Sequence, residues 1–462
     1  MSTKLRITVA AGCCAQSSCC GHGAGRAFSS GSAPGRGFDP AASDGVCYYH
    51  DAVLASTDQG SRDPSSPCRE ADLTALLESR RVILCVGCGG VGKTTTCAAL
   101  GLAAARLGKR ALCLTIDPAK RLAQSLGLTE LKTEAQRIDP AVFQAAGLDV
   151  EGSLTVMMLD TKSTFDALVT DLAQTEEKRQ RILDNVMYQY IATSLAGTQE
   201  YMAMEKLYSV KQSPEYDLIL LDTPPTSHAL DFLDAPERLV SAIDSPAVRW
   251  FLKAFQASGK LSFDLLARSA ASILRGMGKI IGGGFLEQIA QFVTEINDLF
   301  GGWRARADEV ATALRGPEVA YVLVTTPDRM CIREVLFFAD RLEQQGMQPD
   351  AYVVNRVHPF VHDAPTGLPL EQIGQALAEA DLELGEGGAA VVAEAALQEQ
   401  RRARLDRLHM VALEEIDDGD ADSVGRTPLV ACVPDFPQDI HDVERLAQVA
   451  ERLAPPGGPA GS

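Results

Sequence analysis

The chain has 462 residues, of which 43 are Lys or Arg and 61 are Asp or Glu, so its net charge is −18. Apolar residues make up 46% of it, enough for one large α/β unit or for two or three ordinary domains. The acidic balance argues against a nucleic-acid-binding protein, which needs clustered Lys and Arg. No apolar run is long enough to span a bilayer, so we predict no transmembrane helix.

Cysteine usage differs along the chain. Six of the twelve Cys residues lie within the first 68 positions, and the other six are scattered singly through apolar segments. Single cysteines in apolar surroundings are typical of small buried side chains in a reduced, cytosolic protein. We therefore predict a cytoplasmic location, either free or peripheral to a membrane.

The two ends of the chain differ in composition from its middle. Residues 1–38 contain no Asp or Glu and are rich in Gly, Ser and Ala. We predict that residues 1–75 form a disordered or low-complexity tail, while a transit peptide and a chain start placed upstream of the real one remain open. Residues 457–462 are rich in Gly and Pro and are predicted to be a flexible tail.

Between residues 76 and 456, short apolar runs alternate with helical patterns, which predicts an α/β fold with a doubly wound, mostly parallel sheet. The predicted strands are apolar almost throughout, as expected of strands buried on both faces. They are Val82–Val86, Ala111–Ile116, Asp217–Leu221, Ala320–Thr325, Tyr352–Asn355 and Leu429–Val433. Residues 236–314 are predicted to form an inserted helical subdomain. Glu371–Leu413 is predicted to be a second helical stretch, followed by an acidic loop at Glu414–Asp422.

The strongest motif follows the first strand. Residues 87–94 read GCGGVGKT and satisfy the phosphate-loop pattern G-x-x-x-x-G-K-[ST], with a helix predicted over Thr95–Leu107. Glycines let backbone N–H groups surround a phosphate, and the helix N-terminus adds its positive dipole end. Lys93 is expected to reach the β and γ phosphates as a catalytic residue, and the Thr94 hydroxyl is expected to bind Mg²⁺. The predicted nucleotide-binding residues of this loop are Gly87, Gly89, Gly90, Val91, Gly92, Lys93, Thr94 and Thr95.

Two carboxylates follow predicted strands. Asp117 ends the run LTID, and Asp222 ends the run LILLD. Ligands of open α/β sheets bind at the carboxyl ends of strands, so these carboxylates are expected beside the phosphate loop. One can hold Mg²⁺ and the other can orient the attacking water. The alternative is that each only caps the helix that follows.

Several segments of the chain resemble those of a known family. The loop GCGGVGKTT and the segments TIDPAKRLA, AGTQEYMAMEKL, DTPPTSHALDFL and YVVN resemble the arsenical pump-driving ATPases and their relatives, the ATPases that target tail-anchored membrane proteins. The resemblance extends over about residues 80–453. It implies a P-loop ATPase with a deviant phosphate loop that uses ATP and Mg²⁺.

The resemblance also implies roles for single residues. Asp117 matches the aspartate that positions the hydrolytic water, Asp222 matches the aspartate near Mg²⁺, and Asn355 matches the asparagine that recognises adenine. The family works as a dimer. Its helical subdomain corresponds to residues 236–314 and, in the targeting branch, forms an apolar groove for a client helix.

The chain departs from the family at one position of the phosphate loop. The family usually carries a lysine, which reaches the partner's phosphate, where this chain has Cys88. A thiol cannot neutralise transition-state charge as an ammonium does. Another basic residue replaces the lysine, a paralogous partner supplies it, or hydrolysis is slow.

The predicted function is therefore an ATP-hydrolysing dimeric switch that couples nucleotide state to a surface of the helical subdomain. Two alternatives remain: a weakly hydrolysing regulatory subunit in a heterodimer with a lysine-bearing paralogue, and the energising subunit of an anion or metalloid efflux pump. The candidate partners are accordingly a second copy, a paralogous ATPase, a hydrophobic client helix and a membrane pump subunit. No nucleic-acid partner is predicted.

Overall fold

The computed structural model describes residues 71–116, 122–123, 126, 128, 133–186, 188–189, 192, 198–224, 234–235, 238, 241, 299–359, 369–380, 382, 385, 387–417 and 427–456. The predicted N-terminal tail up to residue 70 and most of the predicted helical subdomain lie outside these residues. Pro64–Asp435 and Ile440–Ser462 form one compact unit, to which all the elements below belong.

An eight-stranded sheet forms the centre of this unit, in the order β3-β4-β2-β5-β1-β6-β7-β8. All neighbouring pairs are parallel except the antiparallel β3–β4 pair. The strands are β1 (Val82–Gly87), β2 (Arg110–Thr115), β3 (Gln136–Arg137), β4 (Ser153–Met158), β5 (Leu218–Asp222), β6 (Val319–Thr325), β7 (Ala351–Val357) and β8 (Leu429–Pro434). The predicted fold class, an α/β doubly wound and mostly parallel sheet, is confirmed.

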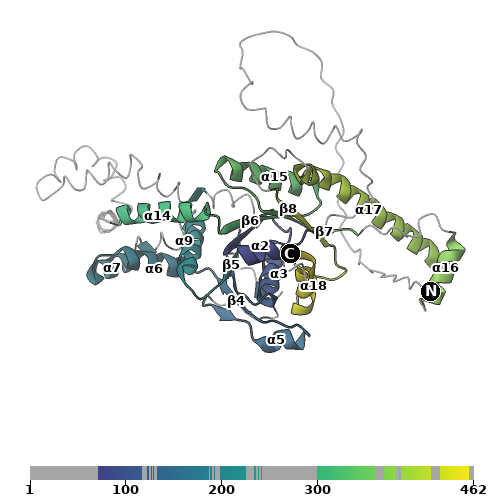
Figure 1. The fold of residues 1–462 in the computed structure, drawn as a ribbon, viewed down its shortest axis with the longest axis horizontal. Helices are drawn as coiled ribbons and strands as arrows, with labels where there is room; N and C mark the ends of the chain where they lie inside the picture. Colours follow the sequence, from purple (N-terminus) through teal and green to yellow (C-terminus); the bar gives the residue numbers. More distant parts are fainter. Residues whose placement is uncertain are drawn as a thin grey trace, which may run out of the picture. The chain divides into compact units, whose positions relative to one another are not determined.

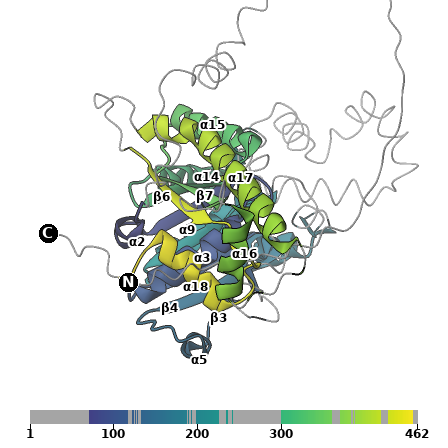
Figure 2. The ribbon, with the colours of Figure 1, turned by 90° about the vertical axis from the view of Figure 1, so that its right-hand side faces the viewer.

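Helices cover both faces of the sheet (Figures 1 and 2). On one face, α3 and α18 pack against each other. Helix α3 also contacts β1, β2, β4 and β5, and α18 contacts β8. Helices α9, α14 and α15 lie on the other face. The helices are α2 (Thr74–Ser79), α3 (Lys93–Arg106), α5 (Pro140–Ala145), α6 (Thr161–Leu172), α7 (Glu176–Leu183), α9 (Thr198–Gln212), α14 (Phe300–Leu314), α15 (Arg329–Gln344), α16 (Leu370–Glu379), α17 (Gly388–Asp417) and α18 (Val443–Leu453). Because both faces are covered, β1, β5 and β6 are buried along their whole length, which explains their unbroken apolar sequences.

All six predicted strands are present, within two residues of their predicted ends. The predicted helical stretch at Glu371–Leu413 consists of two helices, α16 and α17. The prediction of a loop from Glu414 onward is wrong for its first four residues, because α17 continues to Asp417. Met410 and Leu413 are fully buried against the core and fix these last turns of the helix. Among the described residues, no helix combines the length and the apolar character that a bilayer crossing requires.

Three cysteines from different elements meet between helix α3 and strands β1 and β2. Cys85 of β1, Cys97 of α3 and Cys113 of β2 are fully buried free thiols. Hydrogen bonds with Cys113 and Cys85, together with burial, raise the pKa of Cys97, so the group stays protonated. Cys88 and Cys331 are also free, whereas Cys432 is disulfide-bonded.

Candidate functional site

The phosphate loop joins the end of β1 to the start of α3, as its sequence predicts. Gly87 ends the strand so close to the neighbouring strand β6 that a Cβ atom there would lie 1.9 Å from the Val324 carbonyl oxygen. A side chain at this position would therefore push β1 and β6 apart. Glycine here lets the loop begin directly at the carboxyl edge of the sheet, where ligands of open α/β sheets bind.

The last glycine of the loop is fixed by both its backbone and a neighbouring side chain. Gly92 caps α3 in the left-handed region, with φ of 97°, which favours glycine. A Cβ atom there would also lie 2.2 Å from the Asn355 amide nitrogen. That amide donates a 2.8 Å hydrogen bond to the carbonyl of Val91. The structure therefore brings Asn355, on β7, into contact with the phosphate loop.

Lys93 begins α3 and curls back over the loop. Its side chain is 8% exposed, and its ammonium donates a 2.7 Å hydrogen bond to the carbonyl of Cys88. Lysine is seldom buried to this extent unless its charge has partners. The ammonium thus lies within the arc of the loop, among backbone groups rather than in bulk water.

Thr94 and Asp222 meet across the edge of the sheet. The Thr94 hydroxyl donates a 2.8 Å hydrogen bond to Asp222 Oδ2, and the Thr115 hydroxyl donates a 3.0 Å bond to the same oxygen. Asp222 is 1% exposed. The predicted pair of magnesium ligands is therefore adjacent, with Thr94 in the first turn of α3 and Asp222 at the end of β5.

Thr115 is a member of this group that the sequence motifs do not identify. It is the last residue of β2, and the strand register places it directly beside Asp222 of β5. The sequence could have identified Thr115, because the two predicted strands that carry Thr115 and Asp222 end at the same edge of the sheet. A hydroxyl at the end of one is then expected to face a carboxylate at the end of the other.

Asp117, the predicted water-positioning residue, lies outside the described residues. Ile116 before it is buried, and its backbone N–H donates to the carbonyl of Asp222 at 3.4 Å. The Gln199 side chain, in the first turn of α9, donates to the Ile116 carbonyl at 3.4 Å. The start of α9 thus touches the same sheet edge as the phosphate loop.

Cys88, which replaces the family's loop lysine, is 3% exposed. Its thiol lies 3.5 Å from the backbone carbonyl oxygen of Cys331, in the first turn of α15. The side chain therefore packs under the neighbouring helix instead of extending into solvent. No group of three or more His, Cys, Asp or Glu side chains in the described part of the chain is arranged to hold a metal ion.

A buried ion pair joins α9 to α14. Helix α14 is the last element of the predicted helical subdomain. Arg306 donates a 2.8 Å hydrogen bond to Glu205, which is 3% exposed, and its guanidinium lies 4.4 Å above the ring of Tyr208. Burial raises the pKa of Glu205, although Arg306 opposes the shift. The side chains of Tyr201 and Trp303 are buried nearby, with their rings in contact. We call this contact the α9–α14 junction.

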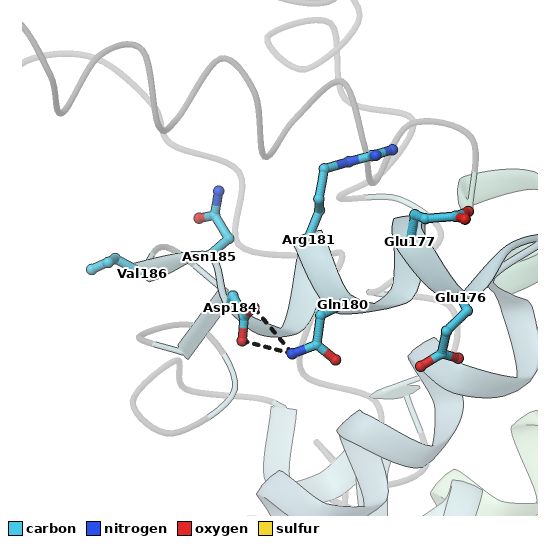
Figure 3. Close-up of a pocket in the computed structure, with 7 residues that line it drawn as sticks. All are labelled: Glu176, Glu177, Gln180, Arg181, Asp184, Asn185 and Val186. Atoms are coloured by element: carbon cyan, nitrogen blue, oxygen red, sulfur yellow. Dashed lines mark hydrogen bonds between the residues drawn. The ribbon is translucent and has the colours of Figure 1, made fainter.

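A surface hollow of about 650 Å³ lies along α7 and the turn after it (Figure 3). Its lining residues are Glu176, Glu177, Gln180, Arg181, Asp184, Asn185 and Val186. Gln180 donates to Asp184 within it. The lining holds three carboxylates and one cation and none of the predicted site residues, so it does not suit an anionic nucleotide.

Comparison with known proteins identifies the family. The family described as anion-transporting ATPase matches residues 80–366, more than half of the chain. ATPase GET3 of Malassezia globosa is 26% identical over 289 residues, covering 61% of this chain and 73% of that protein. ATPase get3 of Aspergillus terreus is 27% identical over 292 residues, covering 62% and 77%. Since the matched region includes the phosphate loop, Asp222 and Asn355, the chain belongs to the anion-transporting ATPase family and is an ATPase.

Proposed function

We propose that this ATPase is a dimeric, Mg²⁺-dependent switch that couples its nucleotide to a surface formed by the helical region 236–314. The observation that carries the proposal is the position of α9. Its first turn contacts the sheet edge through Gln199 and Ile116, and two turns later Glu205 holds Arg306 of α14. A shift at the nucleotide edge can therefore pass along one rigid helix to the end of the helical region.

The loop residues have separate roles in this proposal. The loop amides and Lys93 bind the phosphates, and Asn355 recognises adenine. Asp117 positions the attacking water. The buried ammonium of Lys93 supports its role, because a cation surrounded by backbone groups is pre-oriented for a phosphate that replaces the Cys88 carbonyl as its partner.

Thr94 and Asp222 are proposed to hold Mg²⁺. The ion prefers oxygen ligands and keeps several waters, so one hydroxyl and one carboxylate suffice on the protein side. The two oxygens lie 2.8 Å apart and can face the same ion, directly or through water. Held there, Mg²⁺ would neutralise charge on the phosphates. The residues fit this ion.

The test of the switch is Mg²⁺-dependent ATP turnover by the purified full chain, measured together with its mass in solution with and without ATP. We expect turnover, loss of turnover in Asp117→Asn, and a dimer in the presence of ATP. Asp117→Asn should still bind ATP, because the phosphate contacts remain. A chain that hydrolyses ATP only as a monomer would contradict the dimeric switch.

The regulatory-subunit alternative has one observation in its favour. Cys88 is buried against α15, so the loop carries no cation at the position where the family has its lysine. If the chain binds ATP tightly but hydrolyses it only after a lysine-bearing paralogue is added, the regulatory subunit is the correct function and the self-sufficient dimeric switch is not.

The efflux-pump alternative predicts ATP turnover that is stimulated by arsenite or antimonite. Burial and hydrogen bonds raise the pKa of the Cys97 thiol, and this buried, protonated group does not favour a soft metalloid site.

A further inference from the structure

Strand β7 is interrupted immediately after Asn355. The register between β7 and β8 shifts between Asn355 and Val357, so that Arg356 is an extra residue in a β-bulge. Its φ is +62°, and it is the one non-glycine residue with positive φ in the described part of the chain. Glycine, asparagine or aspartate usually occupy this conformation, because a longer side chain is strained there.

Contacts on both sides hold Arg356 in this conformation. The preceding residue, Asn355, is bound to the phosphate loop through Val91. The carbonyl of Val357 accepts a 2.9 Å hydrogen bond from the Asp435 N–H. The backbone N–H and the ring Nδ1 of His358 both lie 2.8 Å from Asp406 on α17. Backbone strain that is fixed in this way is often associated with function.

The guanidinium of Arg356 differs from those of two other arginines near the sheet in its lack of hydrogen bonds and ion pairs with the described residues. Arg356 is exposed, and it forms no hydrogen bond or ion pair with the described residues. By contrast, Arg80 pairs with Asp350 and Arg110 pairs with Asp217. Leaving a cation without a partner in a chain of net charge −18 is consistent with a role in binding an external anion.

We propose that Arg356 binds the phosphates of the nucleotide held by the phosphate loop. Arg356 directly follows the residue whose side chain touches Val91, and consecutive Cα atoms are about 3.8 Å apart, so its backbone lies beside the phosphate loop. A guanidinium binds phosphate oxygens through two parallel hydrogen bonds. This inference rests on the proposed function, because it requires a nucleotide at the loop.

The test separates the charge of Arg356 from the strain of its backbone. Arg356→Asn removes the charge and tolerates the positive φ, whereas Arg356→Lys keeps the charge and the strain. Arg333→Gln is the matched control, since it removes an exposed arginine from α15 that also has no partner among the described residues. Titration calorimetry would measure the binding of Mg-ATP, Mg-ADP and adenosine to the full-length proteins at low and moderate salt.

We expect Arg356→Asn to weaken ATP binding about tenfold, and ADP binding by less, with the loss shrinking as salt increases. Adenosine binding should not change. Arg356→Lys keeps the charge but not the two parallel hydrogen bonds, so its ATP affinity should lie between those of the wild type and Arg356→Asn. Arg333→Gln should match the wild type. Thermal unfolding of Arg356→Asn and Arg356→Gly should show unchanged or higher stability, which excludes misfolding as the cause.

Two results would overturn the inference while leaving the proposed function intact. Either Arg356→Asn binds ATP as tightly as the wild type, or it loses ATP and adenosine equally, which would place the contact on the nucleoside. Lys93→Met tests the function itself, because it should lose ATP binding regardless of Arg356. If the wild type binds no ATP, both the function and the inference fail.

Discussion

The phosphate-loop edge and the α9–α14 junction both bury charged side chains, but they hold them differently. At the loop, Lys93 donates to a backbone carbonyl and Asp222 accepts from two hydroxyls. At the junction, Glu205 and Arg306 bind each other as opposite charges. Hydrogen bonds to a carbonyl or a hydroxyl are exchangeable, so the loop groups can transfer to a phosphate or a metal ion. The charges of Glu205 and Arg306 neutralise each other, so this ion pair holds α9 against α14 instead of binding a ligand.

The junction also buries a carboxylate oxygen that lacks a hydrogen-bond partner among the described residues, Glu205 Oε2. A buried polar atom without a partner lowers stability, so the junction depends on the Glu205–Arg306 ion pair, the hydrogen bond from Tyr208 to Glu309 and its aromatic packing. The comparison predicts that substitutions at the loop mainly affect activity and substitutions at the junction mainly affect stability.

The largest effect is expected from Lys93→Met. Removing the ammonium should lower ATP turnover by about a hundredfold or more, because a charge that stabilises the transferring phosphate is lost. The hydrogen bond to the Cys88 carbonyl contributes about 1 kcal/mol to the unfolding free energy, and methionine fills the same space, so the loss of stability should be small beside the loss of turnover. Turnover assays and chemical denaturation measure the two quantities. A variant that unfolds easily but retains its turnover would reverse the assignment.

Arg306→Leu should have the opposite profile. It leaves the buried Glu205 carboxylate without its cation, so we expect a loss of about 2–4 kcal/mol in unfolding free energy at neutral pH. ATP affinity should change little, because no loop residue is altered. The double variant Glu205→Leu, Arg306→Leu should regain most of the stability. If it is no more stable than the single variant, the ion pair is not the feature that matters.

Thr94→Val and Thr115→Val are matched variants whose effects on turnover and stability separate metal binding from structural support at the loop. Each removes one hydrogen bond to the same oxygen of Asp222. Thr94→Val should lower Mg²⁺-dependent turnover about tenfold, partly recoverable at high Mg²⁺, because it also removes a predicted ligand. Thr115→Val should cost about 1 kcal/mol of stability and change turnover by less than about threefold. Equal losses of turnover would argue against Thr94 as a metal ligand.

The smallest effect concerns pH at the junction. Burial raises the pKa of Glu205 above its ordinary value of 4.5, with smaller contributions from Asp171 and Glu309, and Arg306 opposes the shift. The folded protein therefore binds this proton more tightly than the unfolded chain does. This contribution to stability is fully present below pH 4.5 and is lost as the pH rises through the raised pKa.

Glu205→Gln cannot titrate and should remove this contribution. Denaturation across this pH range should show the wild type losing stability relative to the variant as the pH rises. A wild type that instead gains stability relative to the variant would mean that Arg306 outweighs burial.

Much of the fold was predictable because its central strands are buried on both faces. Val82–Gly87 and Val319–Thr325 read as continuous apolar runs, and no other element type explains runs of that length beside glycine-rich turns. Strand β4 was missed because Ser153 and Thr155 interrupt its apolar pattern, although Thr155 is buried in the sheet. Strand β3 has only two residues, too few to show any period.

The site was predictable where function imposes a local motif and not where it depends on distant contacts. The spacing of glycines, Lys93 and Thr94 is local, so the sequence reveals it directly. Asn355 was assigned by resemblance alone, and its bond to Val91 depends on the order of strands in the sheet, which no local pattern encodes. The pairing of Glu205 with Arg306 likewise joins residues 101 positions apart.

The hydrogen bond between Asn355 and Val91 spans 264 positions of the chain, and this has a consequence for synthesis. A ribosome delivers the phosphate loop long before it delivers β6 and β7, which flank and brace that loop in the finished protein. The growing chain therefore carries a loop that lacks its brace for most of translation. Messages truncated before residue 355 should yield products that cannot hold the loop in place, so that nucleotide capture becomes a late event in the life of each molecule.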